Sequence, residues 1–383
     1  MRVPFLDLSR STRELRTEIE AGLARVLDRG WFVLGEEGAA FEREFASALG
    51  AKHAVGVASG TDAIELALRA LDVGPGNDVV TQANTCIPTI SAIERTGARA
   101  VLCDVEPEGA TMCVASLERA LTRDTRAIVP VHLYGQCADM DALLTLAAER
   151  SIPVVEDCAQ AHLATYGHRF AGTISRLGAF SFYPTKNLGA AGDGGAVVTS
   201  DDALAERLRL VRQYGQSGRY EHVRRGVNSR LDEVQAAILR AKLPRLAAGN
   251  ERRKEIAAIY DAALADTAFR PLARFLGRSH VFHLYVIRAP DRARVQDELA
   301  ARGVDTLIHY PKPVHGHPGY KDLGASGVDL SNSELLAREV LSLPMFPELA
   351  DDEVTHVADA VRAVGRTEAI IARPGQSASA MSL

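Results

Sequence analysis

Aromatic residues and paired cysteines are scarce in this sequence. Aromatic side chains make up 5% of the 383 residues, there is a single tryptophan, and the number of cysteines is odd. No two cysteines have C-x-x-C spacing, which argues against a zinc site and against a disulfide framework. The five cysteines are Cys86, Cys103, Cys113, Cys137 and Cys158. We therefore expect buried free thiols, a reducing compartment and no metal site.

The sequence also lacks a targeting segment and a surplus of one charge. Its first residues, MRVPFLD, contain no apolar signal core, and no apolar run reaches the length of a membrane span. The net charge is -5 with acids and bases interspersed, so no basic block suggests nucleic acid. These absences predict a cytoplasmic protein that contacts neither membrane nor nucleic acid and acts on a small molecule.

What the sequence does contain is a regular alternation of strand and helix patterns. Hydrophobic residues make up 47% and charged residues 24%, which is ordinary for a globular chain of one large and one smaller domain. Strand-like runs are 53–57, 78–81, 100–103, 127–131, 152–155, 179–182 and 196–199, and helical patterns include 11–28, 61–71, 89–96, 115–120, 140–150 and 202–214. The alternation predicts an α/β fold whose mainly parallel sheet of about seven strands has helices on both faces.

The C-terminal third shows longer helical patterns and a single alternating strand. Helices are expected over 231–246 and 250–264 with a break at Pro244, a strand over 281–288, and helices over 292–301, 335–341 and 352–364. We therefore divide the chain into a large α/β domain, 1–245, and a small α+β domain, 246–372. Residues 373–383 are rich in Pro, Gly, Ser and Ala without periodicity, which predicts a disordered tail.

A lysine and an acid follow two of the strand-like runs. Lys186 lies between the apolar run 177–182 and the glycine-rich stretch 189–195, and Asp157 comes directly after the run 152–155. Taken singly, such a lysine is usually a surface residue and such an aspartate a cap or turn residue. Together they match the needs of pyridoxal phosphate (PLP), with the lysine forming a Schiff base and the carboxylate keeping the pyridine nitrogen protonated.

Two glycine-containing stretches have different interpretations. Ser59-Gly60-Thr61-Asp62 joins a strand to a helix, where free backbone N–H groups and the helix dipole favour an anion; Gly60 and Thr61 are candidate phosphate donors, and a plain capping turn is the alternative. The run 192–195 is not G-x-G-x-x-G and precedes a strand. We interpret it as the tight turn that lets the strand return after the lysine loop.

Four motifs in the same order resemble the DegT/DnrJ/StrS family of PLP-dependent sugar aminotransferases. They are VASGTDAIELAL, VEDCAQAH, FSFYPTKNLGAAGDGGAVVT and GVNSRLDEVQAAIL, and the resemblance runs from about residue 3 to about residue 365. The resemblance implies a fold-type I PLP transferase (aspartate aminotransferase-like). It makes Lys186 and Asp157 the catalytic pair and places the cofactor phosphate at Gly60 and Thr61.

The same resemblance implies further cofactor contacts. Gln160 corresponds to the residue that hydrogen-bonds the phenolic O3′, and Ser181 to a phosphate-binding hydroxyl. Asn228 corresponds to an asparagine that reaches the phosphate of a neighbouring subunit's cofactor, which implies a homodimer with shared active sites. Cys86 departs from the family, which usually has an aromatic residue there that stacks on the pyridine ring; a thiol covers less area, so another group is expected over the ring. His162 has either a packing role beside the cofactor or no role.

The stretch HYPKPVH at 309–315 resembles family members that act on nucleotide-linked 3-keto-6-deoxy sugars. A proline-stiffened connector is the alternative interpretation. Tyr183, His309 and Tyr310 are the residues expected near the sugar, and Arg230 is a candidate for a substrate carboxylate, or else a solvated charge at a helix start.

The resemblance implies a transaminase with L-glutamate as amino donor. The expected acceptor is a dTDP-linked 3-keto-6-deoxyhexose, which would become a 3-amino sugar; a 4-keto sugar or a keto-cyclitol is the alternative. The family also contains PLP-dependent sugar dehydratases, in which histidine replaces the lysine, and its name partly refers to regulators. Lys186 argues against the first, and the complete set of Asp157, Gln160, Ser181 and Lys186 argues against the second.

Overall fold

The computed structural model describes residues 1–371, so the expected tail at 373–383 and the end of the expected small domain lie outside the described residues. Each of the seven strand-like runs overlaps a strand, although the bounds differ. They are β1 (His53–Val57), β2 (Asp78–Gln82), β3 (Arg99–Cys103), β4 (Thr125–Val129), β5 (Val155–Asp157), β8 (Leu177–Ser181) and β9 (Gly195–Thr199). β5 begins later than expected, because Ile152 still donates its N–H to Ala147 at the end of a helix and Pro153 has no N–H.

The strands pair as a four-stranded sheet, β1-β9-β8-β5, and a three-stranded sheet, β3-β2-β4. Isolated parallel bridges, Ile128–Val154 and Val131–Asp157, connect the two sheets between β4 and β5. β9 runs antiparallel to β1 and β8, whereas β2, β3 and β4 are mutually parallel, as are β5 and β8. The carboxyl ends of β1, β5 and β8 therefore meet at one edge, which is where open α/β sheets bind ligands.

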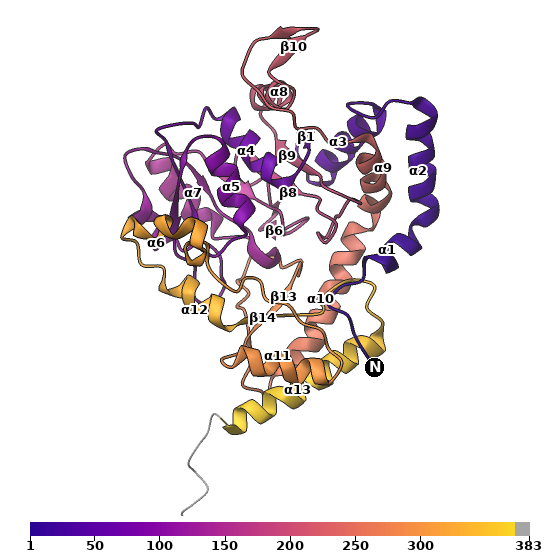
Figure 1. Ribbon diagram of the computed structural model, residues 1–383, viewed down its shortest axis with the longest axis vertical. Helices are drawn as coiled ribbons and strands as arrows, with labels where there is room; N and C mark the ends of the chain where they lie inside the picture. Colours follow the sequence, from indigo (N-terminus) through magenta and orange to yellow (C-terminus); the bar gives the residue numbers. More distant parts are fainter. Residues whose placement is uncertain (372–383) are drawn as a thin grey trace, which may run out of the picture.

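Helices cover the sheet on both faces (Figure 1). They are α3 (Glu36–Ala48), α4 (Gly60–Ala70), α5 (Ile87–Arg95), α6 (Val114–Ala120), α7 (Met140–Glu149), α8 (Asp202–Val211) and α9 (Glu233–Lys242). β8 shows the two-sided burial: Phe180 packs into one hydrophobic cluster with Phe41 and Phe45, whereas Leu177 and Ala179 belong to the other. Alternate residues of a strand point to opposite faces, so a strand between two helical layers is apolar on both.

The helix expected over 11–28 is two helices, α1 (Leu8–Glu14) and α2 (Arg16–Arg29). Leu15 separates them with φ -107° and ψ 16° and packs with Ile19 against Ile238 of α9. α1 has a different partner, because Arg10 bonds the carboxylate of Glu353 at the other end of the chain. The two segments follow different tertiary contacts, which the continuous periodicity does not reveal.

The C-terminal part is built around a small antiparallel sheet, β12 (Arg270–Pro271), β13 (Tyr285–Arg288) and β14 (Val340–Leu343). α10 (Leu246–Leu264), α11 (Arg292–Ala301) and α13 (Asp351–Ile371) lie around it, in the lower half of Figure 1. The expected break at Pro244 is a 3-10 turn, η2 (Leu243–Arg245). Val3 joins the hydrophobic cluster of this part, so the start of the chain packs with its end. The division of the chain at 245/246 stays a prediction.

Two expected elements of this part differ in the structure. The helix predicted over 335–341 is α12 (Ser331–Glu339), and Val340 and Leu341 pair with β13 instead. The strand predicted over 281–288 begins only at Tyr285. The run at 340–341 fits helix and strand equally well, and its pairing with β13 decides between them. β13 begins at Tyr285 because its pairing with β14 begins there, opposite Leu343.

The remaining elements are short. Two hairpins, β6 (Thr165–Tyr166) with β7 (Arg169–Phe170) and β10 (Gln216–Gly218) with β11 (Glu221–His222), accompany the 3-10 turns η1 (Leu133–Gly135), η3 (Val314–Gly316) and η4 (Pro318–Ser326). The β10 hairpin projects from the top of the molecule in Figure 1. None of the helices described is long and apolar enough to cross a membrane.

Candidate active site

Lys186 lies in a tight turn between β8 and β9. Its N–H donates to the carbonyl of Tyr183 (2.8 Å), and the chain returns so closely that a Cβ at Gly189 would lie 2.3 Å from the Pro184 carbonyl oxygen. Only glycine fits such an approach. Beyond the turn, Ser181 pairs with Gly195 across the antiparallel β8–β9 ladder. The chain thus returns to the sheet after the lysine, as expected, but the close approaches lie at 183–189, and Gly195 already belongs to β9.

The amine of Lys186 is not engaged by any described residue. Its Nζ takes part in no hydrogen bond or ion pair within residues 1–371, although most of the side chain is buried. Burial lowers the pKa of Lys186, and the nearby Cys86 and Asp157 act in the opposite direction. A largely buried amine without a partner is poised to react, because the neutral form of an amine is the nucleophile and base.

Asp157 ends β5 and is 3% exposed. Its carboxylate accepts the N–H of Ala159 on Oδ1 (3.1 Å) and the hydroxyl of Thr89 on Oδ2 (2.9 Å). Burial raises the pKa of Asp157, and these hydrogen bonds and the charge of Lys186 oppose the rise. With one donor on each oxygen, the carboxylate keeps lone pairs for a further donor.

Cys86 and Tyr310 meet beside Lys186. Cys86 is the N-cap of α5, and the hydroxyl of Tyr310 lies close to its thiol. Gln160 fixes this tyrosine: its Nε2 donates to the Tyr310 hydroxyl (3.2 Å) while its Oε1 accepts the N–H of Tyr134 (2.6 Å). The structure thus brings Cys86, Gln160, Tyr310, Asp157 and Lys186 together, and it supplies an aromatic side chain next to the thiol.

The expected phosphate site is a cradle between α4 and β8. Ser59 caps α4 by accepting the N–H of Asp62 (3.1 Å), and this cap leaves room for an anion at the same helix end. Among the described residues, the N–H groups of Gly60 and Thr61 have no acceptor. A Cβ at Gly60 would lie 2.5 Å from the Cβ of Ser181, so glycine brings the helix N-terminus against the serine. Free amides, a helix dipole and a hydroxyl fit a phosphate group.

Asn187 ties the lysine turn to the C-terminal part of the chain. Its Nδ2 donates to Asn250 Oδ1 (2.8 Å) and to the Val281 carbonyl (3.1 Å), and its Oδ1 bonds His283 Nδ1 (3.1 Å). Asn250 in turn donates to the carbonyl of His162 (2.9 Å). Sequence reasoning missed this role, because its partners lie far along the chain. The only local signal is the position of Asn187 directly after the lysine.

The residues expected near the sugar are only partly gathered. His309 lines a cavity of about 650 Å³ with Thr185 and His283, bonds Ser342 Oγ (2.9 Å), and has its pKa lowered to about 4 by burial and by Lys186. Tyr183 is 52% exposed, on the outer side of the lysine turn. His309 and Tyr310 therefore lie near Lys186, whereas no described contact draws the Tyr183 side chain inward.

Asn228 and Arg230 are not joined to this group by any described contact. Asn228 is exposed, and its backbone forms a bridge with Gln213. Arg230 lies over the ring of Tyr214, with its guanidinium carbon 5.9 Å from the ring centre. Their roles toward cofactor and substrate stay predictions.

His162 packs into the hydrophobic core behind the site. Its ring lies 5.4 Å from that of Phe180 and 5.9 Å from that of Phe182, and burial, with a smaller effect of Lys186, lowers its pKa to about 3. Neither ring nitrogen has a hydrogen-bond partner among the described residues. These contacts favour a packing role.

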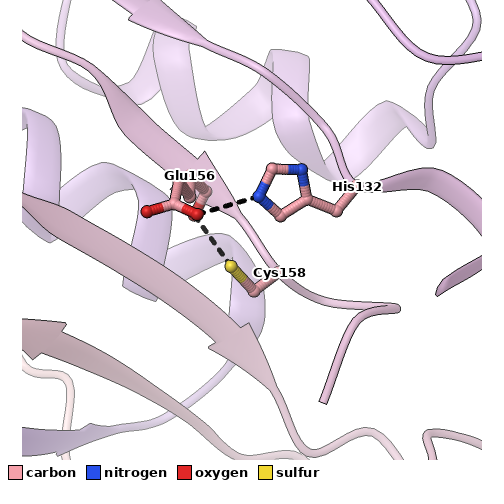
Figure 2. Close-up of side chains that lie close together, drawn as sticks. All are labelled: His132, Glu156 and Cys158. Atoms are coloured by element: carbon pink, nitrogen blue, oxygen red, sulfur yellow. Dashed lines mark hydrogen bonds and ion pairs between the residues drawn. The ribbon is translucent and has the colours of Figure 1, made fainter. Parts of the chain in front are cut away.

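His132, Glu156 and Cys158 form a compact buried cluster (Figure 2). His132 Nδ1 accepts the N–H of Ala138 (3.2 Å), so its Nε2 carries the proton and donates to Glu156 Oε2 (2.9 Å). Three backbone N–H groups, those of Gly172, Ile174 and Ser175, also bond the Glu156 carboxylate. Both oxygens of the Glu156 carboxylate and both ring nitrogens of His132 already take part in hydrogen bonds. The cluster therefore has a structural role and does not offer free metal ligands.

Comparisons with known proteins identify the family of this chain. The model of the DegT/DnrJ/EryC1/StrS aminotransferase family matches residues 13–362. A dTDP-3-amino-3,4,6-trideoxy-alpha-D-glucose transaminase of Streptomyces venezuelae is 48% identical over 94% of this chain and 96% of its own length. The erythromycin biosynthesis sensory transduction protein EryC1 of Saccharopolyspora erythraea is also 48% identical, over 95% of this chain and all of its own.

A solved structure is similar over the same range. The crystal structure of S. venezuelae DesV in complex with a ketimine intermediate has a TM-score of 0.92 and 47% identity, and the match covers 94% of this chain and 98% of that one. The family match spans both the sheet that carries Asp157 and Lys186 and the C-terminal part that carries His309 and Tyr310. The chain belongs to the DegT/DnrJ/EryC1/StrS aminotransferase family.

Proposed function

We propose that this protein is a PLP-dependent sugar aminotransferase that moves an amino group from L-glutamate to a dTDP-linked 3-keto-6-deoxyhexose. The observation that carries the proposal is the amine of Lys186, largely buried and without a partner among the described residues, beside the carboxylate of Asp157. Both lie at the sheet edge where Gly60 and Ser181 form an anion cradle. A regulator that merely shares the fold has no need for a reactive amine in this setting.

The residues present fit pyridoxal phosphate. The N–H groups of Gly60 and Thr61 and the hydroxyl of Ser181 would hold the phosphate, and Asp157 the pyridine nitrogen. Gln160 would donate to O3′ with the N–H of its amide that Tyr310 leaves free, and Cys86 and Tyr310 would lie near the ring. When bound, the group supplies an aldehyde for covalent capture by an amine and a ring that accepts electron density.

Asp157 would hold a proton on the pyridine nitrogen. An ionised carboxylate against a protonated nitrogen forms a charge-assisted hydrogen bond, and a dry site strengthens it. The two donors already on Asp157, Ala159 N–H and Thr89 hydroxyl, stabilise its ionised form against the cost of burial. They also fix the plane of the carboxylate, so one lone pair of each oxygen stays directed away from them.

Lys186 would move the proton at Cα of the amino donor. Because burial lowers its pKa, a larger fraction of its amine is neutral near pH 7 than for an exposed lysine. The hydrogen bonds of Asn187 to Asn250 and His283 hold the backbone next to Lys186 in place. Only the side chain of Lys186 then has to move. Positioning of this kind is what makes a side-chain base effective.

The sugar side of the proposal rests on His309, Tyr310 and Tyr183. His309 has a pKa lowered to about 4, so it is a neutral ring near pH 7, able to donate to or accept from a sugar hydroxyl. The name of the S. venezuelae relative, a dTDP-3-amino sugar transaminase, supports the 3-keto acceptor. Arg230 stays the candidate for the donor carboxylate.

We also propose a homodimer with shared sites. Asn228 is exposed, as a residue that reaches into a second copy must be. Beside its segment lies an apolar surface of Leu27, Trp31, Phe32 and Leu34, of which Trp31 is 64% exposed. Phe32 accepts the N–H of Glu233, which joins this surface to the segment after Asn228. Exposed aromatic clusters of this kind are typical of interfaces.

The free cysteines support a cytoplasmic location.

The test follows the visible absorbance of the purified protein loaded with PLP. We expect L-glutamate to bleach the band and release one 2-oxoglutarate per bleached site, and a panel of nucleotide keto sugars to restore it. Restoration by a dTDP-linked 3-keto sugar supports the acceptor proposed, whereas restoration only by a 4-keto sugar or a keto-cyclitol replaces it. A protein that binds PLP and is not bleached by L-glutamate would contradict glutamate as the amino donor.

A further inference from the structure

α5 presents two residues to the site from its first turn. Cys86 is its N-cap and Thr89 lies three residues later, a spacing that puts both on one face of a helix. Cys86 lies near Lys186, and Thr89, 2% exposed, bonds Asp157. The cofactor contacts expected above account for Cys86 and leave Thr89 unassigned.

A chain of hydroxyl groups ends on the carboxylate. Thr85 Oγ1 lies 3.0 Å from Thr89 Oγ1, and Thr89 Oγ1 lies 2.9 Å from Asp157 Oδ2. An ionised carboxylate only accepts hydrogen bonds, so the Thr89 hydroxyl must donate to Asp157 and is free to accept from Thr85. The chain therefore has one direction while Asp157 is charged, and each bond polarises the next.

We propose that Thr89 is a positioning residue, which holds Asp157 ionised and correctly turned for the ring nitrogen of the cofactor. The proposal rests on the proposed function. Thr89 provides the only side-chain donor to this carboxylate among the described residues; the other donor is the backbone N–H of Ala159. Without the hydroxyl, Oδ2 would have no donor in the apo protein, the carboxyl could rotate, and its protonated form would be favoured.

The test compares Thr89→Val with Thr89→Ser in the full-length protein. Valine keeps the shape and removes the donor, whereas serine keeps the donor. The readout is the dissociation constant of PLP added to the apo protein, measured by fluorescence between pH 5 and pH 8. Lost hydrogen bonds to charged groups typically cost a factor of ten or more, so we expect about tenfold weaker binding for Thr89→Val and near-normal binding for Thr89→Ser.

The pH dependence separates this role from a purely structural one. Loss of the hydroxyl raises the pKa of Asp157 further, so acidification should weaken PLP binding at a higher pH in Thr89→Val than in the wild type. The titratable groups facing Asp157 are Lys186 from the turn after β8 and His132 from the segment after β4, and both remain in every variant. A change of helix packing alone would leave unchanged the pH at which PLP binding is half lost.

Thr111→Val is the matched control. Thr111 is fully buried, and its hydroxyl has no hydrogen-bond partner among the described residues, so its loss should leave PLP binding unchanged. Wild-type affinity and an unshifted midpoint for Thr89→Val would overturn the proposal, as would a Thr89→Ser protein as impaired as Thr89→Val. Failure of the wild type to bind PLP would instead contradict the proposed function.

Discussion

Glu156 and Asp157 are adjacent buried carboxylates on β5, and the strand turns them to opposite faces of the sheet. Glu156 accepts three backbone N–H groups and the Nε2–H of His132 (Figure 2), all of which can only donate in this arrangement. Asp157 accepts one N–H and one hydroxyl. The hydroxyl belongs to a chain of threonines that can reverse its direction.

The difference shows how the same chemical group serves structure in one place and chemistry in the next. A carboxylate whose lone pairs are all used holds its donors and has nothing left for a ligand. A carboxylate with lone pairs to spare remains costly to bury until a ligand donor arrives. Glu156 thus fixes the loop 172–175 against β5, while Asp157 faces the amine of Lys186.

Lys186→Ala should have the largest effect, because it removes the amine that would bind the cofactor covalently and move the proton at Cα of the donor. We expect transamination to fall by roughly 10⁴-fold or more, with the melting temperature of the apo protein preserved. Borohydride reduction of the wild type loaded with PLP should fix the cofactor on Lys186, as seen by mass spectrometry of peptides. An adduct on another lysine would contradict the assignment.

Asp157→Asn should lower the turnover number by about 10²–10³ at full cofactor occupancy, because the charge on the ring nitrogen is no longer balanced. Stability should move the other way. The folded pKa of Asp157 is raised above its ordinary value of 3.8, so the native state binds more protons, and wild-type apo protein loses stability as pH rises above that value.

Asparagine has no such charge to bury, and the threonine chain can reverse to accept its N–H. We therefore expect the apo Asp157→Asn protein to melt above the wild type at neutral pH, with the gap closing toward pH 4. An unchanged turnover number at full occupancy would remove Asp157 from the mechanism.

Glu156→Gln should lower the stability of the apo protein, whereas Asp157→Asn should raise it. The side-chain amide introduced by this substitution carries an NH₂ group in place of one carboxylate oxygen. The backbone N–H groups and the Nε2–H of His132 cannot become acceptors, so at least one buried N–H group would point at another. We expect a loss of about 2–4 kcal/mol in the free energy of unfolding, measured by urea denaturation of the apo protein. Asp157→Asn is the natural control. Equal stability of the two variants would show that the number of donors on each carboxylate does not determine its contribution to stability.

The smallest change to be measured is a partial recovery of activity in mixed dimers, which tests Asn228 across two chains. Inactive Lys186→Ala chains mixed with inactive Asn228→Ala chains should regain up to half of the sites' activity in hybrid dimers. One site then carries both lesions and the other carries neither. A mixture that stays inactive, with subunit exchange shown separately, would place Asn228 in its own chain's site or in none.

Much of the α/β sheet and its helices follows from the sequence by itself. The seven apolar runs predict the strands, because strands buried on both faces need short continuous apolar runs. Asp157 and Lys186 stand at strand ends, where parallel sheets gather their functional groups, but their chemistry is predicted only from the combination of the two and from the family resemblance. The glycine stretch after Lys186 likewise predicts the return of β9, because its tight turn is a local property.

The tertiary structure decided what depends on distant partners. The division of 11–28 at Leu15, the strand at Val340 and Leu341, and the joining of Asn187 to Asn250 follow from packing between segments far apart in sequence. The same holds for Thr89 and Asp157, 68 residues apart. Glu156 and Asp157 look alike in sequence, and only the donors that the fold brings to each decide which is structural and which is free to act.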